Sequence, residues 1–183
     1  MKVAIGLGNP GKEYEETRHN AGRNAVMALA KKIKALAWEE NKKALSLTAV
    51  GEIGKGKILL VTPQTFMNKS GKAVEALGLK ARDVLLVHDD SDIELGKMKF
   101  SFGRRSAGHK GVESVMRVLK RKDFWRLRIG VQKARRAPAD RLVLMKFTPP
   151  ERKIFARVLK HACEAIEIFF SESPEKAMSQ WNK

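Results

Sequence analysis

Three short apolar runs, each followed closely by a polar turn, constrain the fold of this chain most strongly. Apolar runs of this length, bounded by turn signals, are typical of buried strands. The runs, each with the polar residue of interest that comes after it, are Lys2–Leu7 with Asn9, Ile58–Val61 with Asn68, and Val84–Val87 with Asp89. Because open α/β sheets bind ligands just beyond the carboxyl ends of their strands, we expect these three polar residues to meet at one edge of a sheet.

Helical and strand patterns alternate along the rest of the chain. The patterns predict helices over 23–38, 71–79, 110–120, 149–170 and 174–181, and strands over 2–7, 45–52, 57–61, 84–87, 97–102 and 125–131. A turn within 52–57 predicts an antiparallel hairpin, whereas strands linked by helices should be parallel. No Pro/Gly/Ser-rich linker divides the chain, so we predict one α/β domain over residues 1–183, a twisted mixed β-sheet surrounded by helices.

Positive charge is concentrated in one part of the chain, whose formal net charge is +17. Residues 97–136 carry many Lys and Arg side chains against only Glu113 and Asp123. A cluster of this kind indicates attraction to a polyanion, with the phosphate backbone of a nucleic acid as the leading candidate and an anionic membrane surface as the weaker one.

The single cysteine and the absence of long apolar stretches limit where the protein works. Cys163 has no partner for an intrachain disulfide, which suits a reducing cytosol. No stretch is long and apolar enough to span a bilayer, and no charged-then-apolar leader precedes the first strand. We therefore expect a soluble cytoplasmic protein with no membrane partner.

The glycines Gly6, Gly8 and Gly11 match the dinucleotide-binding pattern as a string of letters. Pro10 interrupts the pattern where a helix should begin, and no acidic residue stands about twenty positions further on to bind a ribose hydroxyl. We interpret these glycines as turn residues and expect no nicotinamide and no other cofactor.

His19 and Asp89 form the first candidate for a catalytic pair. A histidine that acts as a general base needs a fixed tautomer and raised basicity, and a carboxylate at the end of a buried strand can supply both. The alternative is that His19 is an ordinary hydrogen-bonding residue in a polar loop. The chain has no Gly-x-Ser-x-Gly elbow and Cys163 lies in an apolar helical pattern, so we expect no covalent nucleophile.

The sequence predicts no metal site. The four histidines, His19, His88, His109 and His161, show no metal-ligand spacing, and Asp89-Asp90-x-Asp92 lacks the glycine and distal glutamate of a calcium loop. His161 lies in the long helical pattern, where we expect it to be structural.

Several motifs together resemble the bacterial-type peptidyl-tRNA hydrolase family, in the same order and spacing, over nearly the whole chain. They are Gly6-Leu7-Gly8-Asn9-Pro10-Gly11, Tyr14 to Asn20 with Gly22, Gln64 to Gly71, His88-Asp89-Asp90-Ser91-Asp92, Gly108-His109-Lys110-Gly111 and Arg126-Leu127-Arg128-Ile129-Gly130. The resemblance implies the mixed sheet already predicted, and hydrolysis of the ester between peptide and tRNA, which recycles tRNA from prematurely released peptidyl-tRNA. It implies the acceptor stem and CCA end as the partner, a monomer, and no metal.

The resemblance also implies roles for particular residues. His19 would deprotonate a water while Asp89 orients its ring, and Asn9 and Asn68 would stabilise the oxyanion, Asn68 also holding the water or the imidazole. Tyr14 and Met67 would receive the terminal ribose and base. Contacts to tRNA phosphates are implied for a basic set, namely Lys99, Arg104, Arg105, Lys110 and Arg128.

The chain departs from the family pattern at two positions and in one loop. Lys110 stands where many relatives have asparagine, so the contacts to the peptide are open, and Ser101 stands where the family often has a second lysine in the clamp for the 5′-phosphate. Arg104 and Arg105 are close enough in sequence to compensate. The basic loop 132–138 lacks the usual glycine and proline arrangement, and we expect it to form a lid over the acceptor stem.

Two rival functions remain. Some relatives in plant organelles act as RNA-splicing partners, so an RNA-binding protein without hydrolase activity is an alternative on the same fold. A general carboxylesterase is another, but such an enzyme has no need of the basic residues.

Overall fold

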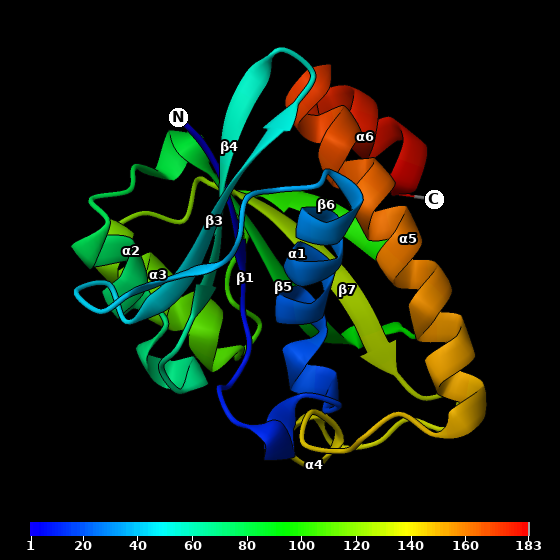
Figure 1. Cartoon of the computed structure of the whole chain (residues 1–183). Coiled ribbons are helices and arrows are strands. Elements are labelled where there is room, and N and C mark those ends of the chain that lie inside the picture. The colour runs from blue at the N-terminus through cyan, green and yellow to red at the C-terminus, as the bar shows by residue number, and fades with distance from the viewer. Residues whose placement is uncertain (183) are drawn as a thin grey trace.

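The computed structural model describes residues 1–182 and contains a seven-stranded mixed sheet with helices on both faces (Figure 1). This confirms the predicted α/β fold class. The strands are β1 (Lys2–Gly6), β2 (Glu39–Asn41), β3 (Ser46–Ile53), β4 (Gly56–Pro63), β5 (Val84–Glu94), β6 (Met98–Phe102) and β7 (Trp125–Gln132). The α-helices are α1 (Ala21–Lys32), α2 (Gly71–Ala76), α3 (Lys110–Leu119), α4 (Ala139–Leu142), α5 (Pro149–Ser171) and α6 (Pro174–Trp181). Short 3₁₀ turns are η1 (Lys12–Tyr14), η2 (Arg18–Asn20), η3 (Met67–Lys69) and η4 (Ala81–Asp83).

The centre of the sheet is parallel and its edges are antiparallel. The strand order is β2-β3-β4-β1-β5-β7-β6, with β1 parallel to β4 and β5, and β5 parallel to β7. β3 and β4 form the predicted antiparallel hairpin, and β6 lies antiparallel to β7. The carboxyl ends of β1, β4, β5 and β7 therefore share one edge, which is where open α/β sheets bind their ligands.

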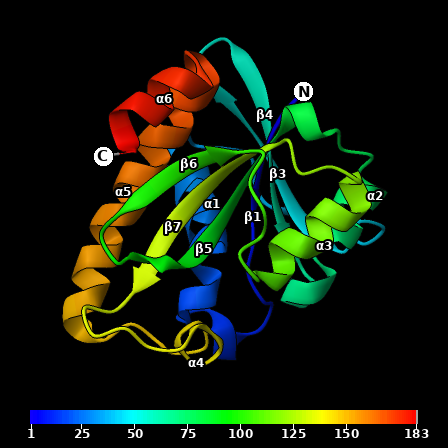
Figure 2. The ribbon, with the colours of Figure 1, turned by 180° about the vertical axis from the view of Figure 1, so that it is seen from behind.

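Both faces of the sheet are buried, which explains the unbroken apolar runs. Successive residues of a strand alternate between two cores: Ala4 and Leu85 belong to the core under α1 and α5, and Ile5 and Leu86 to the core under α2 and α3. Figure 1 shows α1 in front of the sheet, and Figure 2 shows α3 on the opposite side. The two helical layers fix the positions of the loops at the carboxyl edge.

The prediction of a helix over 23–38 is wrong at the carboxyl end, because α1 ends at Lys32. Lys34 adopts a left-handed backbone conformation with φ 49°, which ends the helical path. The apolar spacing continues past this point because Ile33 still packs on the core and the Leu36 amide donates to the Val50 carbonyl, 2.9 Å away. The short strand β2 follows and was not predicted.

The strand predicted over 84–87 is longer than expected, because β5 continues through His88, Asp89 and Asp90 to Glu94. Asp89 lies opposite Ile129 of β7, so it is held by the sheet itself and not by a turn after it. Polar residues are tolerated inside this strand because they have polar partners, described below.

The carboxyl-terminal helices match the prediction closely. α5 begins at Pro149 with a capping box, in which Thr148 and Glu151 satisfy each other's backbone groups. The basic loop 132–138 leads into α4, a single short turn of helix that the sequence did not predict. Among residues 1–182, none of the helices combines the length and the apolar character that crossing a membrane requires.

Gly22 places α1 directly against β5, and we expect Gly22→Ala to destabilise the fold. An added Cβ would lie 2.1 Å from the Val87 carbonyl oxygen, a clash between two backbones that cannot relax easily. The expected cost is about 1–3 kcal/mol or more of unfolding free energy. Thermal and urea unfolding measure it. Gly56→Ala is the matched control, since its Cβ would have only the Ile53 carbonyl oxygen nearby, at 3.8 Å. Equal stability of the two variants would contradict this account.

Candidate active site

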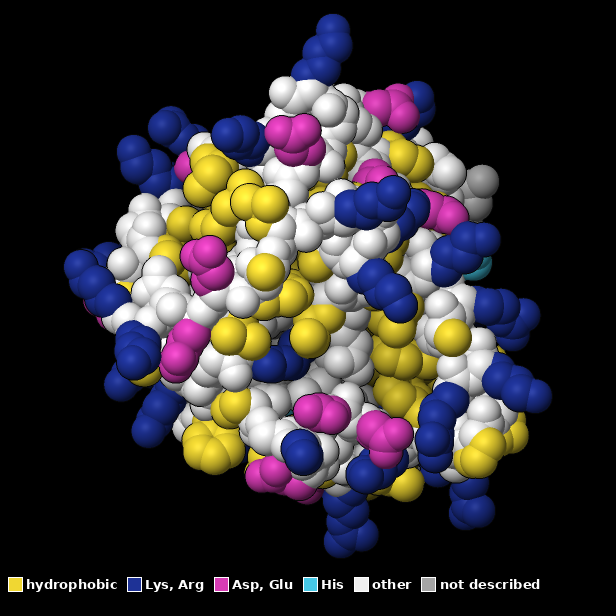
Figure 3. Space-filling model, in the orientation of Figure 1, with side chains coloured by type: hydrophobic (Ala, Val, Ile, Leu, Met, Phe, Trp, Pro, Cys, Tyr) yellow, Lys and Arg dark blue, Asp and Glu magenta, His cyan; other side chains and the backbone are white. Residues whose placement is uncertain are grey.

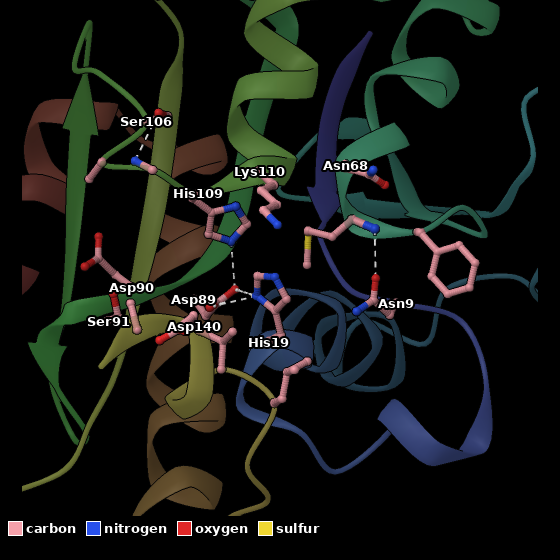
Figure 4. A pocket seen from close by; sticks show the side chains of 17 residues that line it. Asn9, His19, Asn68, Asp89, Asp90, Ser91, Ser106, His109, Lys110 and Asp140 are labelled. Atoms are coloured by element: carbon pink, nitrogen blue, oxygen red, sulfur yellow. Dashed lines mark hydrogen bonds and ion pairs between the residues drawn. The ribbon is translucent and has the colours of Figure 1, made fainter. Parts of the chain in front are cut away.

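A cleft of about 500 Å³ opens at the carboxyl edge of the sheet (Figure 4). Its walls come from the loops after β1 and β4, from β5, from the start of α3 and from α4. The cleft contains Asn9, His19, Asn68 and Asp89 among its lining residues, so the structure brings together the four residues that the sequence singled out for catalysis. Met67 and Lys110 also line it.

His19 is held by Asp89 through one nitrogen of its ring. Nδ1 of His19 lies 2.9 Å and 3.0 Å from the two carboxylate oxygens of Asp89. A carboxylate that is ionised can only accept, so Nδ1 carries the proton and the lone pair is on Nε2. Nε2 has no hydrogen-bond partner among residues 1–182, which leaves it available as a base.

His109 is a second histidine partner of Asp89, and sequence reasoning missed it. Its Nδ1 accepts hydrogen bonds from the backbone amides of Gly111 and Val112 at the start of α3, at 3.1 Å and 3.3 Å. Nε2 must then carry the proton, and it donates to Oδ1 of Asp89 at 2.8 Å. The Gly108-His109-Lys110-Gly111 motif was the available signal, but nothing in its spacing linked it to Asp89.

The Asp89 side chain is only 1% exposed, yet it remains ionised. Burial acts to raise the pKa of Asp89, but attraction to His109 and His19 and the hydrogen bonds from both rings outweigh burial and hold that pKa below its ordinary range. The carboxylate therefore stays negative at neutral pH and accepts hydrogen bonds from both rings.

His88 lies beside this group but does not line the cleft. Its Nδ1 donates to the backbone carbonyl of Asp89 at 2.7 Å, and its ring packs edge-on against His109 with 4.8 Å between centroids. Complete burial, followed by repulsion from His109, lowers the pKa of His88 well below its usual value. A neutral His88 thus packs under the site as a structural residue.

His19, Asp89 and His109 lie close enough to suggest a metal site, contrary to the expectation from sequence spacing. One ligand atom from each lies within 4.8 Å of the others. The chemistry does not fit a cation, because the nitrogen of each ring that faces Asp89 carries a proton and has no lone pair to donate. Freeing His109 Nε2 would move its proton to Nδ1 and break the bonds to α3.

Asn9 presents its amide nitrogen to the cleft. Its Oδ1 accepts from the backbone amide of Met67 at 2.8 Å, and an amide donor requires oxygen at that place, so the NH2 group must face the other way. The Asn9 backbone is clamped by Asn20, whose Oδ1 accepts from the Asn9 amide at 2.8 Å and whose Nδ2 donates to the Asn9 carbonyl at 3.0 Å. In Figure 4 the NH2 of Asn9 points toward His19.

The remaining residues predicted to bind the CCA end differ in their placement. Met67 is buried in the wall of the cleft, whereas Asn68 is exposed at its rim and has no hydrogen-bond partner among the described residues. Tyr14 lies outside the lining and packs edge-on against Phe66, which does line the cleft. Figure 4 shows Lys110 at the start of α3, on the side of the cleft beside His109.

A second groove holds the other four predicted tRNA contacts. Lys99, Arg104, Arg105 and Arg128 line it together, and it shares Ala107 with the catalytic cleft. The two grooves therefore adjoin at the loop 103–109. Arg128 is partly buried and ion-paired with Asp90, 2.7 Å away, while Lys99, Arg104 and Arg105 are exposed.

The positive charge is more widely spread than the sequence suggested. Arg126 is buried and its Nη1 donates to the Arg105 carbonyl at 3.1 Å, so its charge is not exposed for a contact with tRNA. Burial, then repulsion from Arg128, lowers the pKa of Arg126 to about 10. Ser101, which stands where the family often has the second lysine for the 5′-phosphate, is buried as well.

Figure 3 shows Lys and Arg along the edge formed by α5, where Lys153, Arg157 and Lys160 are exposed.

Comparison with known proteins identifies the family of this chain. The family model described as peptidyl-tRNA hydrolase matches residues 3–183. Among curated relatives, the peptidyl-tRNA hydrolase of Carboxydothermus hydrogenoformans is 41% identical over all of this chain and 99% of its own length, and that of Aquifex aeolicus is 38% identical over all of this chain and 97% of its own. A crystal structure of peptidyl-tRNA hydrolase from Acinetobacter baumannii superposes with a TM-score of 0.89 at 29% identity, covering 98% of this chain and 93% of that one. The chain belongs to the peptidyl-tRNA hydrolase family.

Proposed function

We propose that this chain hydrolyses the ester bond between the peptide and the tRNA of peptidyl-tRNA. The observation that carries the proposal is the state of His19: Nδ1 is held by the buried Asp89 carboxylate, and Nε2 is free at the cleft. This is the arrangement that a general base requires. Relatives that match this chain along their whole length are named for the same activity.

The proposed reaction uses water as the nucleophile. His19 Nε2 takes a proton from water as the oxygen bonds to the ester carbonyl, and Asp89 stabilises the imidazolium that forms. When the tetrahedral intermediate collapses, the imidazolium gives the proton to the leaving ribose oxygen. Peptide acid and free tRNA result, and the base is regenerated.

Asn9 is the proposed donor to the oxyanion. Its NH2 is held toward the cleft by the bond between its Oδ1 and the Met67 amide, so it is already oriented before the carbonyl oxygen becomes negative. Asn68 at the rim is exposed and without a partner among residues 1–182, which suits a contact made only with bound substrate or water. We propose that Tyr14 and Met67 support the terminal ribose and base.

The second groove is the proposed site of the acceptor stem. Its exposed cations adjoin the catalytic cleft at Ala107, so a phosphate backbone in one groove can reach the other with its CCA end. We further propose that residues 1–183 act as one domain, as a cytoplasmic monomer. The RNA-splicing alternative would not need a histidine oriented for proton transfer. Cleavage of an N-acetylaminoacyl-tRNA but not of a small aryl ester would support the hydrolase over both rivals.

Replacement of His19 tests the base. We expect His19→Ala to lower kcat by about a hundredfold to ten-thousandfold, because proton transfer contributes that much, while tRNA binding stays nearly intact. Asp89→Asn should also lose most activity, because an amide can donate to Nδ1 and favour the wrong tautomer. Single-turnover deacylation and filter binding measure the two effects. His161→Ala, on the exposed face of α5, is the control. Near-normal kcat in His19→Ala would exclude this assignment.

Asn9→Asp tests the oxyanion donor while keeping the rest of the residue's contacts. The aspartate retains an oxygen for the Met67 amide, but it replaces the NH2 donor with a negative acceptor. We expect kcat to fall by at least about a hundredfold with little change in melting temperature. Asn24→Asp introduces the same charge on α1, away from the cleft lining, and should keep its activity. If both variants lose activity equally, the effect is one of charge and not of a lost donor.

The double variant Arg104→Ala/Arg105→Ala tests the second groove. Phosphate contacts are made in the ground and transition states alike, so we expect KM to rise several-fold or more with little change in kcat. The dependence of affinity on salt should also become shallower. Arg121→Ala is the control, because Arg121 pairs with Asp123 and lies outside this groove. An unchanged KM and salt slope would mean that the groove does not hold the acceptor stem.

A further inference from the structure

The residue before the proposed base is an arginine that is completely buried. The Arg18 side chain is 0% exposed, although a cation is expensive to take out of water. Hydrogen bonds reach its Nη1 and Nη2, whereas its Nε has no hydrogen-bond partner among the described residues. Because replacing a buried ion pair by apolar side chains is often neutral or even stabilising, stability alone does not account for this arginine. Neither the cleft nor the second groove includes Arg18 among its lining residues.

The guanidinium of Arg18 joins three separate parts of the chain. Its Nη2 pairs with Oε2 of Glu151 in the first turn of α5 at 2.6 Å, and its Nη1 donates to the carbonyl of Val131 near the end of β7 at 3.0 Å. It also lies over the ring of Phe147, 4.7 Å from the centroid. β7 is the neighbour of β5, which carries Asp89. The hydrogen bond to Val131 therefore fixes the turn η2 to the strand beside Asp89.

Glu151 is itself fixed. The same oxygen that binds Arg18 accepts from the backbone amide and the hydroxyl of Thr148, at 2.8 Å and 2.9 Å, in the capping box of α5. Burial acts to raise the pKa of Glu151, but the hydrogen bonds from Arg18 and Thr148 outweigh it and keep the carboxylate charged. The anchor for Arg18 is thus a rigid helix start and not a mobile surface acid.

The backbone around Arg18 is tied to the wall of the cleft. The amide of Arg18 donates to the Met145 carbonyl at 3.0 Å, and the amide of His19 donates to the Val143 carbonyl at 2.8 Å. Val143 and Leu144 line the cleft together with His19 and Asp89. Two backbone hydrogen bonds therefore join the turn that carries His19 to the segment that forms this wall, and the Arg18 side chain attaches the turn to α5 and β7.

We propose that Arg18, together with Glu151, is a positioning residue for hydrolysis: it sets the place of His19 relative to Asp89 and of the Val143–Leu144 wall relative to both. The proposal rests on the proposed function of His19. Arg18 contacts no substrate, and it acts through the backbone of η2. Because a displacement of about 1 Å at a reacting group can cost a hundredfold in rate, a small shift of this turn is enough to matter.

Arg18→Lys is the first test, since lysine keeps the charge but cannot bond Glu151 and Val131 together with a planar fork. We expect kcat for N-acetylaminoacyl-tRNA to fall by on the order of tenfold to a hundredfold, with KM changed by less than about twofold. Glu151→Gln, which keeps the shape of the partner and removes its charge, should show the same split. Ile166→Ala, in the core under α5, supplies a destabilised control whose kcat should stay near normal below its melting temperature.

The double variant Arg18→Met/Glu151→Gln separates positioning from stability. It leaves no unpaired charge buried and keeps an oxygen at position 151 for the Thr148 amide and hydroxyl, so it should recover most of the melting temperature that Arg18→Met alone loses. It should not recover kcat, since nothing then binds the Val131 carbonyl. A double variant with normal kcat, or an Arg18→Lys variant no slower than Ile166→Ala at equal distance from its melting temperature, would overturn the proposal.

A spectroscopic measurement tests the same idea without relying on turnover. The Nδ1 proton that His19 donates to Asp89 should give a downfield, slowly exchanging NMR signal. This signal is assigned by its loss in His19→Ala, because Asp89→Asn would also remove the signal of the His109 Nε2 proton. We expect Arg18→Lys to broaden this signal or shift it upfield, and an unchanged signal would contradict the proposal. If the native protein does not cleave peptidyl-tRNA, the proposed function fails, but this signal still shows whether Arg18 holds His19 in place.

Discussion

The buried carboxylate of Asp89 is the interaction on which the rest of the site depends. A carboxylate that is 1% exposed is tolerated in the middle of a sheet only if donors reach it, and here two imidazoles do, His19 from the turn before α1 and His109 from the start of α3. Asp89 in turn fixes the tautomer of both rings. Residues that directly precede the helices on the two faces of the sheet thus meet at one carboxylate, so that the packing of both layers determines the geometry of the proposed base.

The turn η2 builds the site around this carboxylate, because its three consecutive side chains bind different parts of the fold. Arg18 reaches α5 and β7, His19 reaches β5, and Asn20 binds both backbone groups of Asn9 after β1. A 3₁₀ turn suits this task because its tight winding spreads successive side chains around the axis. The base and the proposed oxyanion donor are therefore placed by the same short segment.

The sequence was enough to predict the sheet, most helices and the meeting of Asn9, His19, Asn68 and Asp89, because apolar runs and turn residues report local structure directly. What it could not predict depends on contacts between distant segments. The extension of β5 through Asp89 requires knowing that donors cover the carboxylate, and the role of His109 requires knowing that α3 starts beside β5. Likewise Arg126 and Arg104 look alike in a string of cations, yet one is buried and the other exposed, because β7 lies inside the sheet and the loop 103–109 does not.

That loop also links the two grooves. It begins beside β6 with Gly103, Arg104 and Arg105, and it ends at His109, which caps α3 and donates to Asp89. Gly103, Ala107 and Gly108 all have positive φ, so the loop follows a path that few residues adopt freely. Ala107 is not a glycine, so its positive φ costs conformational free energy that the surrounding contacts must offset. The same backbone therefore carries the exposed cations of one groove and, through His109, a hydrogen bond to the central carboxylate of the other.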